Sequence, residues 1–458
     1  MSGNQLTGYP ENWGQMTREE KRAWRLDQWR RSAEAIDFVS PEAKANCKTR
    51  LERIIAVLSV EEPDRVPVYS ASGLLPLKLA NVDYYTAIRE PEKAAEAFRD
   101  FNQKYAEDLD AWSMPSYLAV PARALEILDL KVYAFPGHGM PDTAFNFQFV
   151  EGEYMKPDEY DVFLQDPSDF WLRTYLPRIF GVFEPLGTTS PLTDIWEIIQ
   201  MQLPGLVRPD IQGMLERLLA AARELTSYYQ VMGPAAALGA AMGFPAVPFI
   251  GFAKAPYDVL GDTLRGTKGV LMDMLRQPDK VLAAMDRIAD LMIKSIVESP
   301  QTPQGLVVIF PLHKGADGWM SEQQFLKFYW PPLKKVVSAL AEEGILCWLF
   351  AEGSYESRLD LLNEFPRAAV CWQFDRTNMA RAKEILGKDC AIIGNVSSSL
   401  LVTGSSEEVK AECRRLIEIC APGGGYYLGP GAVAEFPKLE NLKAMADAAR
   451  EYGVYSGQ

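Results

Sequence analysis

The chain has 458 residues, of which 61 are acidic and 47 basic, so its formal net charge is -14. This acidic balance argues against a nucleic-acid-binding surface and against binding to an anionic membrane. Hydrophobic residues make up 48% of the chain, which is enough to bury the core of one large α/β barrel or of two or three smaller domains.

The sequence predicts a cytoplasmic protein. Its start, MSGNQLTGYPENWGQ, has neither the basic segment nor the apolar run of a signal peptide. The six cysteines form no C-x-x-C pair, so we expect buried, reduced thiols rather than disulfides or a metal cage. The apolar stretch 235–252 contains Gly and Pro, which favours a buried strand and loop over a membrane span.

Residues 1–60 are predicted to form an N-terminal helical arm. The sequence TREE at 17–20 is a capping box, and the Ser-Pro pair at 40–41 begins a second helix with apolar residues at core-facing spacing. Trp24 and Trp29 of the first helix either pack on their own chain or cover a second subunit. A homodimer is therefore one of the two interpretations of this arm.

From residue 61 to 458 the sequence alternates short apolar runs with helical patterns, as parallel α/β folds do. The runs are continuously apolar, which is typical of parallel strands buried on both faces. Three of them end in Glu352, Asp375 and Asn395. We therefore predict a single (β/α)8 TIM-type barrel, with its reacting groups at the carboxyl ends of the strands.

Two further loops carry titratable candidates. The run LVVIF leads to His313 and Asp317, and the turn-rich PGHGMP carries His138. The stretch 180–209 lacks clean periodicity and is expected to cross the barrel mouth. Its Trp196 and Met201 are candidates for lining a pocket, although plain core packing is favoured.

The motifs FAEGS, FDRTN, AKEILG, AIIGNV and GGGYYLGPGA between 344 and 432, with PDRVPV at 63–68, resemble the uroporphyrinogen decarboxylase superfamily. That superfamily contains the porphyrinogen decarboxylases and the corrinoid-dependent methyltransferases. The resemblance covers roughly residues 60–445 and implies the same barrel fold.

Departures from the family pattern narrow the expected chemistry. The decarboxylase branch follows its first strand with an arginine-rich segment that grips substrate carboxylates, whereas this chain reads ASGLLPLKLANVDYY at 71–85. Zinc-dependent methyltransferases of the superfamily use a strand-borne His-x-Cys, whereas this chain has Phe350 and Glu352 there. The resemblance therefore implies neither a porphyrinogen substrate nor a zinc ion that activates a thiol.

The function expected from the resemblance is methyl transfer from a methoxylated, aromatic donor to the Co(I) corrinoid (cobalamin) of a partner protein, without zinc. A phenolate leaves poorly unless it is protonated, so an acid is required. Glu352 is the first candidate, because burial at a strand end raises a carboxyl pKa; His313 and Asp317 are the others. The residues expected to contact substrate are Asp375, Asn395, His138, Tyr355, Trp372 and Tyr427.

Each of these assignments has a structural alternative. The alternative for Glu352, less favoured than a functional role, is an ion pair with Arg358 or Arg376 at the barrel rim. Asp375 is equally suited to capping a helix, and Asn395 to holding its loop. Two other functions stay open: decarboxylation of uroporphyrinogen or a related carboxylate, and a non-catalytic barrel that binds a tetrapyrrole or corrinoid. Clustered carboxyl groups at the strand ends favour an enzyme over a carrier.

Overall fold

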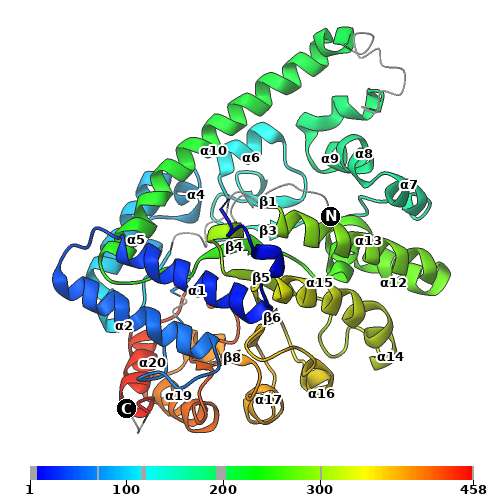
Figure 1. The fold of residues 1–458 in the computed structure, drawn as a ribbon. Helices are drawn as coiled ribbons and strands as arrows, with labels where there is room; N and C mark the ends of the chain where they lie inside the picture. The colour runs from blue at the N-terminus through cyan, green and yellow to red at the C-terminus, as the bar shows by residue number, and fades with distance from the viewer. Residues whose placement is uncertain (1–7, 70–71, 115–119, 192–202, 300–301, 456–458) are drawn as a thin grey trace.

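The computed structural model describes residues 8–69, 72–114, 120–191, 203–299 and 302–455 (Figure 1). Its centre is a parallel sheet of six strands in the order β4-β5-β6-β7-β8-β9. The strands are β4 (Phe249–Phe252), β5 (Val307–Leu312), β6 (Leu346–Ala351), β7 (Val370–Phe374), β8 (Ala391–Ile393) and β9 (Tyr426–Tyr427). Spatial order follows chain order, as expected for repeated βα units.

Alternation along these strands separates two cores. Trp348 of β6 and Tyr427 of β9 face the inside of the curved sheet and belong to one hydrophobic cluster. Leu349 and Trp372 face outward and belong to the larger cluster beneath the surrounding helices. All five residues of β7 are buried, which confirms the prediction of strands covered on both faces.

The sheet continues beyond β9 into the segment 64–69. The Tyr69 backbone N–H donates to the Leu428 carbonyl at 2.8 Å, and Val68 forms a parallel bridge with Leu428. This arrangement is that of a TIM-type α/β barrel, as predicted. Within the described ranges, no ladder of hydrogen bonds closes the circuit between this segment and β4. A separate small sheet comprises β1 (Tyr133–Pro136), β2 (Gly139–Met140) and β3 (Gln148–Phe149).

Helices surround the sheet (Figure 1). The longer ones are α1 (Arg18–Glu34), α2 (Pro41–Leu58), α5 (Pro91–Leu109), α10 (Pro209–Ala241), α12 (Gly266–Arg276), α13 (Pro278–Val297), α15 (Trp330–Glu342), α17 (Met379–Leu386), α19 (Ser406–Cys420) and α20 (Leu439–Tyr452). Short helices are α3 (Leu75–Leu79), α4 (Tyr84–Ala87), α6 (Ala122–Leu128), α7 (Tyr160–Gln165), α8 (Pro167–Phe170), α9 (Leu176–Ile179), α11 (Pro256–Asp258), α14 (Glu322–Gln324), α16 (Leu359–Leu362) and α18 (Ser398–Thr403). Short 3-10 or π segments are η1 (Trp13–Gln15), η3 (Trp171–Tyr175), η4 (Gly181–Thr188), η6 (Leu203–Val207), η7 (Val259–Leu264), η8 (Thr302–Gln304), η9 (Phe325–Tyr329) and η10 (Glu356–Arg358).

The two N-terminal helices pack on their own chain. The capping box of α1 is present, and Trp29 is buried in the inner cluster together with Trp348. Trp24 contacts Trp13, with ring centroids 5.3 Å apart. These tryptophans therefore have partners within the chain, and both the arm boundary at residue 60 and a homodimer stay predictions.

The apolar stretch 235–252 forms the end of α10, a connecting loop and β4. Of the helices in the described ranges, none combines the length and the apolar character that crossing a bilayer requires. The sequence did not predict that α10 runs for 33 residues. Trp196 and Met201, the pocket candidates before this helix, lie outside the described residues. All six cysteines are buried free thiols, as expected.

Candidate active site

His313 follows β5 at the carboxyl end of the sheet and is the centre of the site. Its Nδ1 lies 2.5 Å from Asp262 Oδ2, and its Nε2 lies 3.9 Å from Glu352 Oε1. Burial lowers the pKa of the imidazole, but the hydrogen bond and the charge of Asp262 outweigh burial, so the pKa is raised above its ordinary value. The geometry thus favours an imidazolium held between two carboxyl groups.

Asp262 is the anchor of this arrangement and lies in η7, the π-helical segment that follows β4. Besides His313, it is paired with Lys254 at 3.1 Å and with the Lys314 ammonium. Burial raises the pKa of Asp262, but the hydrogen bonds and charges of these three cations lower it well below its usual range. Asp262 therefore stays ionised and fixes the orientation of the His313 ring.

Asp258, one helical turn before Asp262, holds the loop that carries His313. It is fully buried and accepts hydrogen bonds from the backbone N–H groups of His313 and Lys314, each at 3.0 Å, and from the Tyr329 hydroxyl at 2.8 Å. Burial, reinforced by the nearby charge of Asp262, raises the pKa of Asp258 to about 6. Its role is to position the loop rather than to meet a ligand.

Glu352 follows β6 on the neighbouring strand, as the sequence predicted. Burial raises the pKa of its carboxyl, the charge of His313 lowers it, and the charges of Asp375 and Asp262 raise it again, for a net upward shift. The side chain is 42% exposed, so it faces the barrel mouth. Its predicted alternative partners, Arg358 and Arg376, pair elsewhere: Arg358 Nε lies 3.8 Å from Asp317, and Arg376 Nε lies 3.6 Å from Asp375.

Asp375 and Asn395 hold the loops at the ends of β7 and β8. Asp375 accepts the backbone N–H of Gly353 at 3.1 Å, next to Glu352. The Asn395 amide donates to the carbonyls of Asp375 and Thr377 at 3.2 and 2.8 Å. Asp375 thus holds the loop that carries Glu352, and Asn395 in turn holds the loop after β7 that carries Asp375.

Asp317, the third candidate acid, is tied to the loop after β6. It accepts hydrogen bonds from the hydroxyls of Ser354 at 2.8 Å and Ser357 at 2.6 Å. Burial raises the pKa of Asp317, but these hydrogen bonds lower it below its ordinary value. A carboxyl held ionised in this way is poorly suited to donate a proton, so the structure favours His313 and Glu352 over Asp317.

The other predicted substrate contacts lie elsewhere. His138 is in the turn after β1, where its Nε2 is 2.7 Å from the Leu130 carbonyl and its ring stacks on Phe135. Trp372 is fully buried on the outward face of β7, in the core beneath the helices. Placing Trp372 at the mouth was therefore incorrect, because its position in the strand points it away from the barrel interior.

Tyr355 and Tyr427, two further predicted substrate contacts, also lie away from the barrel mouth. Tyr355 is fully buried below the site, and its hydroxyl donates to the Leu312 carbonyl at 3.3 Å. Tyr427 is on the inner face of β9 and lines a cavity of about 400 Å³ in the barrel interior. Among the described residues, neither tyrosine forms a hydrogen bond with His313 or Glu352, and both side chains are buried in the interior rather than exposed at the mouth.

The residues at the mouth do not fit a zinc site. Within the described part of the chain, no three His, Cys, Asp or Glu side chains come together as metal ligands. Nδ1 of His313 is already bound to Asp262, and the inner position two residues before Glu352 is Phe350. Among the described residues, the mouth thus offers no set of three ligands of the kind that binds zinc.

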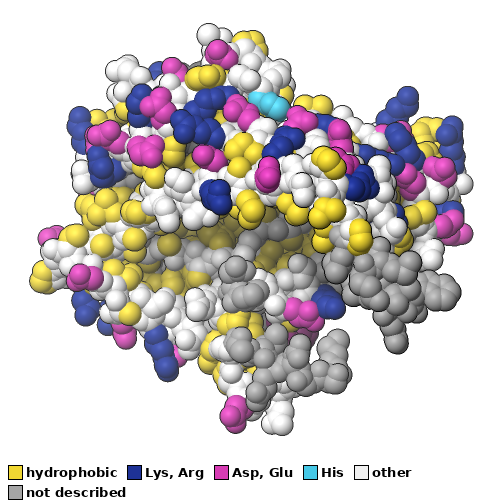
Figure 2. Space-filling model, turned by 90° about the horizontal axis from the view of Figure 1, so that it is seen from above, with side chains coloured by type: hydrophobic (Ala, Val, Ile, Leu, Met, Phe, Trp, Pro, Cys, Tyr) yellow, Lys and Arg dark blue, Asp and Glu magenta, His cyan; other side chains and the backbone are white. Residues whose placement is uncertain are grey.

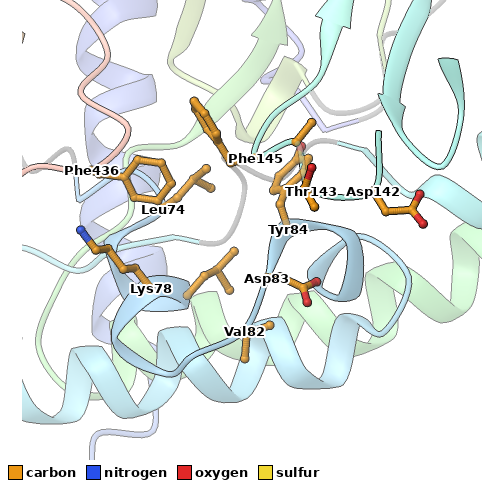
Figure 3. Close-up of a pocket in the computed structure, with 11 residues that line it drawn as sticks. Leu74, Lys78, Val82, Asp83, Tyr84, Asp142, Thr143, Phe145 and Phe436 are labelled. Carbon is orange, nitrogen blue, oxygen red and sulfur yellow. The ribbon is translucent and has the colours of Figure 1, made fainter. Parts of the chain in front are cut away.

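A separate pocket of about 300 Å³ lies where α3 and α4 meet the loop after β2 and the chain after β9 (Figure 3). Phe145 and Phe436 face each other there, edge to face at 5.3 Å. The pocket contains no imidazole and none of the residues around His313. Figure 2 shows a further recess, a band across one face where hydrophobic side chains gather between charged surfaces.

The comparisons with known proteins agree with this fold. The family model described as uroporphyrinogen decarboxylase (URO-D) matches residues 215–452. The chain therefore belongs to the URO-D family. A methyltransferase from Methanosarcina mazei has a similar structure, with a TM-score of 0.51 at 17% identity, over 88% of this chain and 98% of that one.

Two sequence relatives are described as uroporphyrinogen decarboxylases. The one from Syntrophotalea carbinolica is 28% identical over 211 residues, which are 44% of this chain and 59% of the relative. The one from Geobacter sulfurreducens is 23% identical over 198 residues, 42% of this chain and 56% of the relative. The matches thus span a little over half of each relative's length.

Sequence reasoning missed Asp258, Asp262, Lys254 and Lys314. All four lie directly after apolar runs, in AKAPYDVLGD after β4 and in HKG after β5. The two aspartates are four residues apart, which places them on one side of a helical turn. That spacing, next to a strand end, was the signal available in the sequence.

Proposed function

We propose that this protein is a methyltransferase that removes the methyl group of a methoxylated aromatic donor and passes it to the Co(I) corrinoid of a partner protein. The observation that carries the proposal is the chain Asp262–His313–Glu352 at the carboxyl ends of β5 and β6. It holds a proton donor with a raised pKa at the place where barrel enzymes carry out chemistry.

The proton is needed because a phenolate leaves poorly. When the methyl carbon is attacked by Co(I), the O–CH₃ bond breaks and a Co–CH₃ bond forms, with the cobalt supplying the electron pair of the new bond. The electron pair of the broken bond stays on the aryl oxygen. His313 Nε2 or the Glu352 carboxyl gives its proton to that oxygen, so the product leaves as a neutral phenol.

Asp262 and Asp258 are the positioning residues in this proposal. Asp262 keeps the His313 ring in one orientation and favours its charged form, as a carboxylate hydrogen-bonded to an imidazole does in other enzymes. Asp258 fixes the backbone of the same loop through two N–H groups. In this proposal the corrinoid is a substrate that the partner protein carries. The similarity of the fold to that of the methyltransferase from Methanosarcina mazei supports methyl transfer as the reaction.

Decarboxylation is the second candidate, because the sequence relatives are described as uroporphyrinogen decarboxylases. The mouth, however, presents Asp262, Glu352 and Asp375, and the ammonium groups of Lys254 and Lys314 are already paired with Asp262. A substrate with many carboxylates would meet like charge there, which costs binding energy. Methyl transfer from a donor without such charges fits this site better.

The test is single-turnover methyl transfer from a series of ring-substituted anisoles to reduced cobalamin, comparing wild type with Glu352→Gln. The substitution keeps the shape and removes the transferable proton. We expect the rate to fall about 10²–10⁴-fold, with less effect on substrate binding. The defect should shrink as the ring becomes electron-poor, because a more acidic phenol needs less protonation.

Two results would count against the proposal. A rate loss that is independent of the acidity of the leaving phenol would remove proton transfer by Glu352 from the mechanism. Turnover of uroporphyrinogen to coproporphyrinogen at the rate of a true decarboxylase, with no demethylation of any anisole, would reverse the ranking of the two candidates.

A further inference from the structure

The inside of the barrel contains a cavity of about 400 Å³ on the amino-terminal side of the sheet. It lies between the inner faces of β4, β6 and β9, the segment 67–69, helix α2 and the loop after α10. Its lining is mostly apolar, with Arg50, Arg53 and Asp110 on one side, and its aromatic members are Tyr69, Trp112, Phe244, Phe249, Trp348 and Tyr427. Packed interiors rarely leave such a volume empty.

The rings that line the cavity meet edge to face. The centroids of Tyr69 and Trp348 are 5.7 Å apart with an interplanar angle of 63°, and those of Tyr69 and Tyr427 are 6.3 Å apart at 80°. Phe249 is 6.2 Å from Trp348. Rings in this arrangement offer both faces and edges to a further ring, which is the geometry that aromatic pairs prefer.

The hydroxyls of Tyr427 and Tyr69 in this wall form no hydrogen bond among the described residues, and Tyr427 is the more deeply buried of the two. The Tyr427 side chain is 8% exposed. The two indole N–H groups nearby are occupied: Trp348 donates to Gln373 at 3.0 Å, and Trp112 donates to the Ala235 carbonyl at 3.1 Å. A buried hydroxyl is normally hydrogen-bonded, so Tyr427 leaves one bond for a ligand.

The charges at one end of the cavity are balanced. Arg50 is paired with Asp110 at 3.2 Å and with Glu107 at 2.7 Å, and Arg53 is paired with Asp64 at 2.6 Å. Each guanidinium faces a carboxylate, so the described residues of the cavity lining include no unmatched cation for an anionic ligand. Taking an unpaired charge into this apolar volume would be costly.

We propose that this cavity binds a neutral arene with an oxygen substituent, of the class of phenols and aryl methyl ethers, with Tyr427 hydrogen-bonded to that oxygen. An apolar cavity of about 150 Å³ is enough for benzene, so the larger volume here accommodates a substituted ring. Trp348 lies four residues before Glu352 on the same strand, which puts the two about 13 Å apart. The cavity is therefore a second site, distinct from the one around His313.

The first experiment measures binding of 2-methoxyphenol to the whole chain by calorimetry and by tryptophan fluorescence, without any corrinoid. We expect one molecule per chain in the cavity, in addition to the one that the proposed function places at the mouth, with quenching of tryptophan emission and no binding of benzoate. Tyr427→Phe removes one hydrogen bond and should weaken 2-methoxyphenol binding about 3–10-fold while leaving toluene binding unchanged. Tyr229→Phe, at a side chain 65% exposed on α10, is the matched control.

A second variant blocks the cavity. Ala246→Trp places an indole in the cavity lining and should remove one bound 2-methoxyphenol per chain, whereas His313→Gln should leave that molecule bound; circular dichroism checks that both variants are folded. A stoichiometry that is unchanged in Ala246→Trp would place every bound arene outside the cavity and overturn the inference, as would no binding to wild type. Since no methyl transfer is measured, these outcomes are independent of whether the proposed function is correct.

Discussion

The two ends of the same barrel differ in what they expose. At the carboxyl ends of β5 and β6, His313 lies between Asp262 and Glu352, and the pKa of each group is shifted. On the amino-terminal side, Trp348 and Tyr427 line an aromatic cavity. Neighbouring residues of the same strands thus supply proton chemistry at one end and apolar binding surface at the other.

The difference follows from what each position can bury. Strand interiors are covered on both faces, so a charge placed there would lose its hydration without compensation. Side chains just beyond a strand end reach loops, whose N–H groups and cations stabilise a carboxylate. This is why the titratable groups cluster after the strands, and why charges near the cavity occur only as matched pairs such as Arg50 and Asp110.

Among the changes that separate the two ends of the barrel, we expect His313→Gln to have the largest effect, and that effect is on the rate of demethylation. Glutamine keeps a hydrogen-bonding group but has no transferable proton, so the single-turnover rate should fall about 10²–10⁴-fold. Binding of 2-methoxyphenol to the cavity should stay unchanged. His138→Gln, the matched substitution at the only other histidine, should cause a much smaller loss; equal losses would contradict the assignment of the acid.

A smaller effect concerns stability and is expected at Asp258. Asn at this position turns an N–H group toward the donors of His313, Lys314 and Tyr329, so the free energy of unfolding should fall by about 2–4 kcal/mol at pH 7. Urea unfolding measures it. Asp142→Asn, an exposed residue, should change the free energy by less than about 0.5 kcal/mol.

The pH dependence of that difference has a definite sign. The pKa of Asp258 is raised from 3.8 to about 6 in the folded protein, so its contribution to stability is fully present below the unfolded value and is lost as pH rises through the folded one. The advantage of wild type over Asp258→Asn should therefore shrink between about pH 4 and pH 6. An advantage that grows over this window would contradict the raised pKa.

The smallest expected effect is that of a chelator. Because the mouth lacks a zinc ligand set, treatment with EDTA should leave the rate of methyl transfer unchanged. Elemental analysis should find no stoichiometric zinc in the active protein. One zinc per chain, with activity lost on chelation and restored by zinc alone, would show that a metal site exists and would overturn this expectation.

Much of the framework was predictable from the sequence, because apolar runs that end in polar residues mark parallel strands. Glu352, Asp375, Asn395 and His313 are at strand ends as expected. The inward or outward direction of strand residues was not predictable. Trp372 lies in a run buried on both faces, where hydrophobicity does not distinguish the two sides, and a shift of one residue moves a side chain from one core to the other.

Asp262 shows a second limit of prediction from the sequence. It is part of a π-helical segment after β4, and its partners His313 and Lys314 are about fifty positions later in the chain. Only the parallel pairing of β4 with β5 brings these loops together. Sequence spacing alone does not predict this contact between distant segments. The position of Asp262, four residues after Asp258 and close to a strand end, did indicate that the two aspartates lie on one side of a helical turn.

The central claim is that Asp262 keeps His313 protonated at the mouth, and NMR titration of the imidazole tests it most directly. The chain has two histidines, so His138→Gln assigns both signals. We expect a pKa for His313 above the ordinary value of about 6.5, and a fall of that pKa in Asp262→Asn, where burial is opposed only by the weaker effects of Asp258 and Glu352. A pKa at or below the ordinary value in wild type, unchanged by Asp262→Asn, would contradict it.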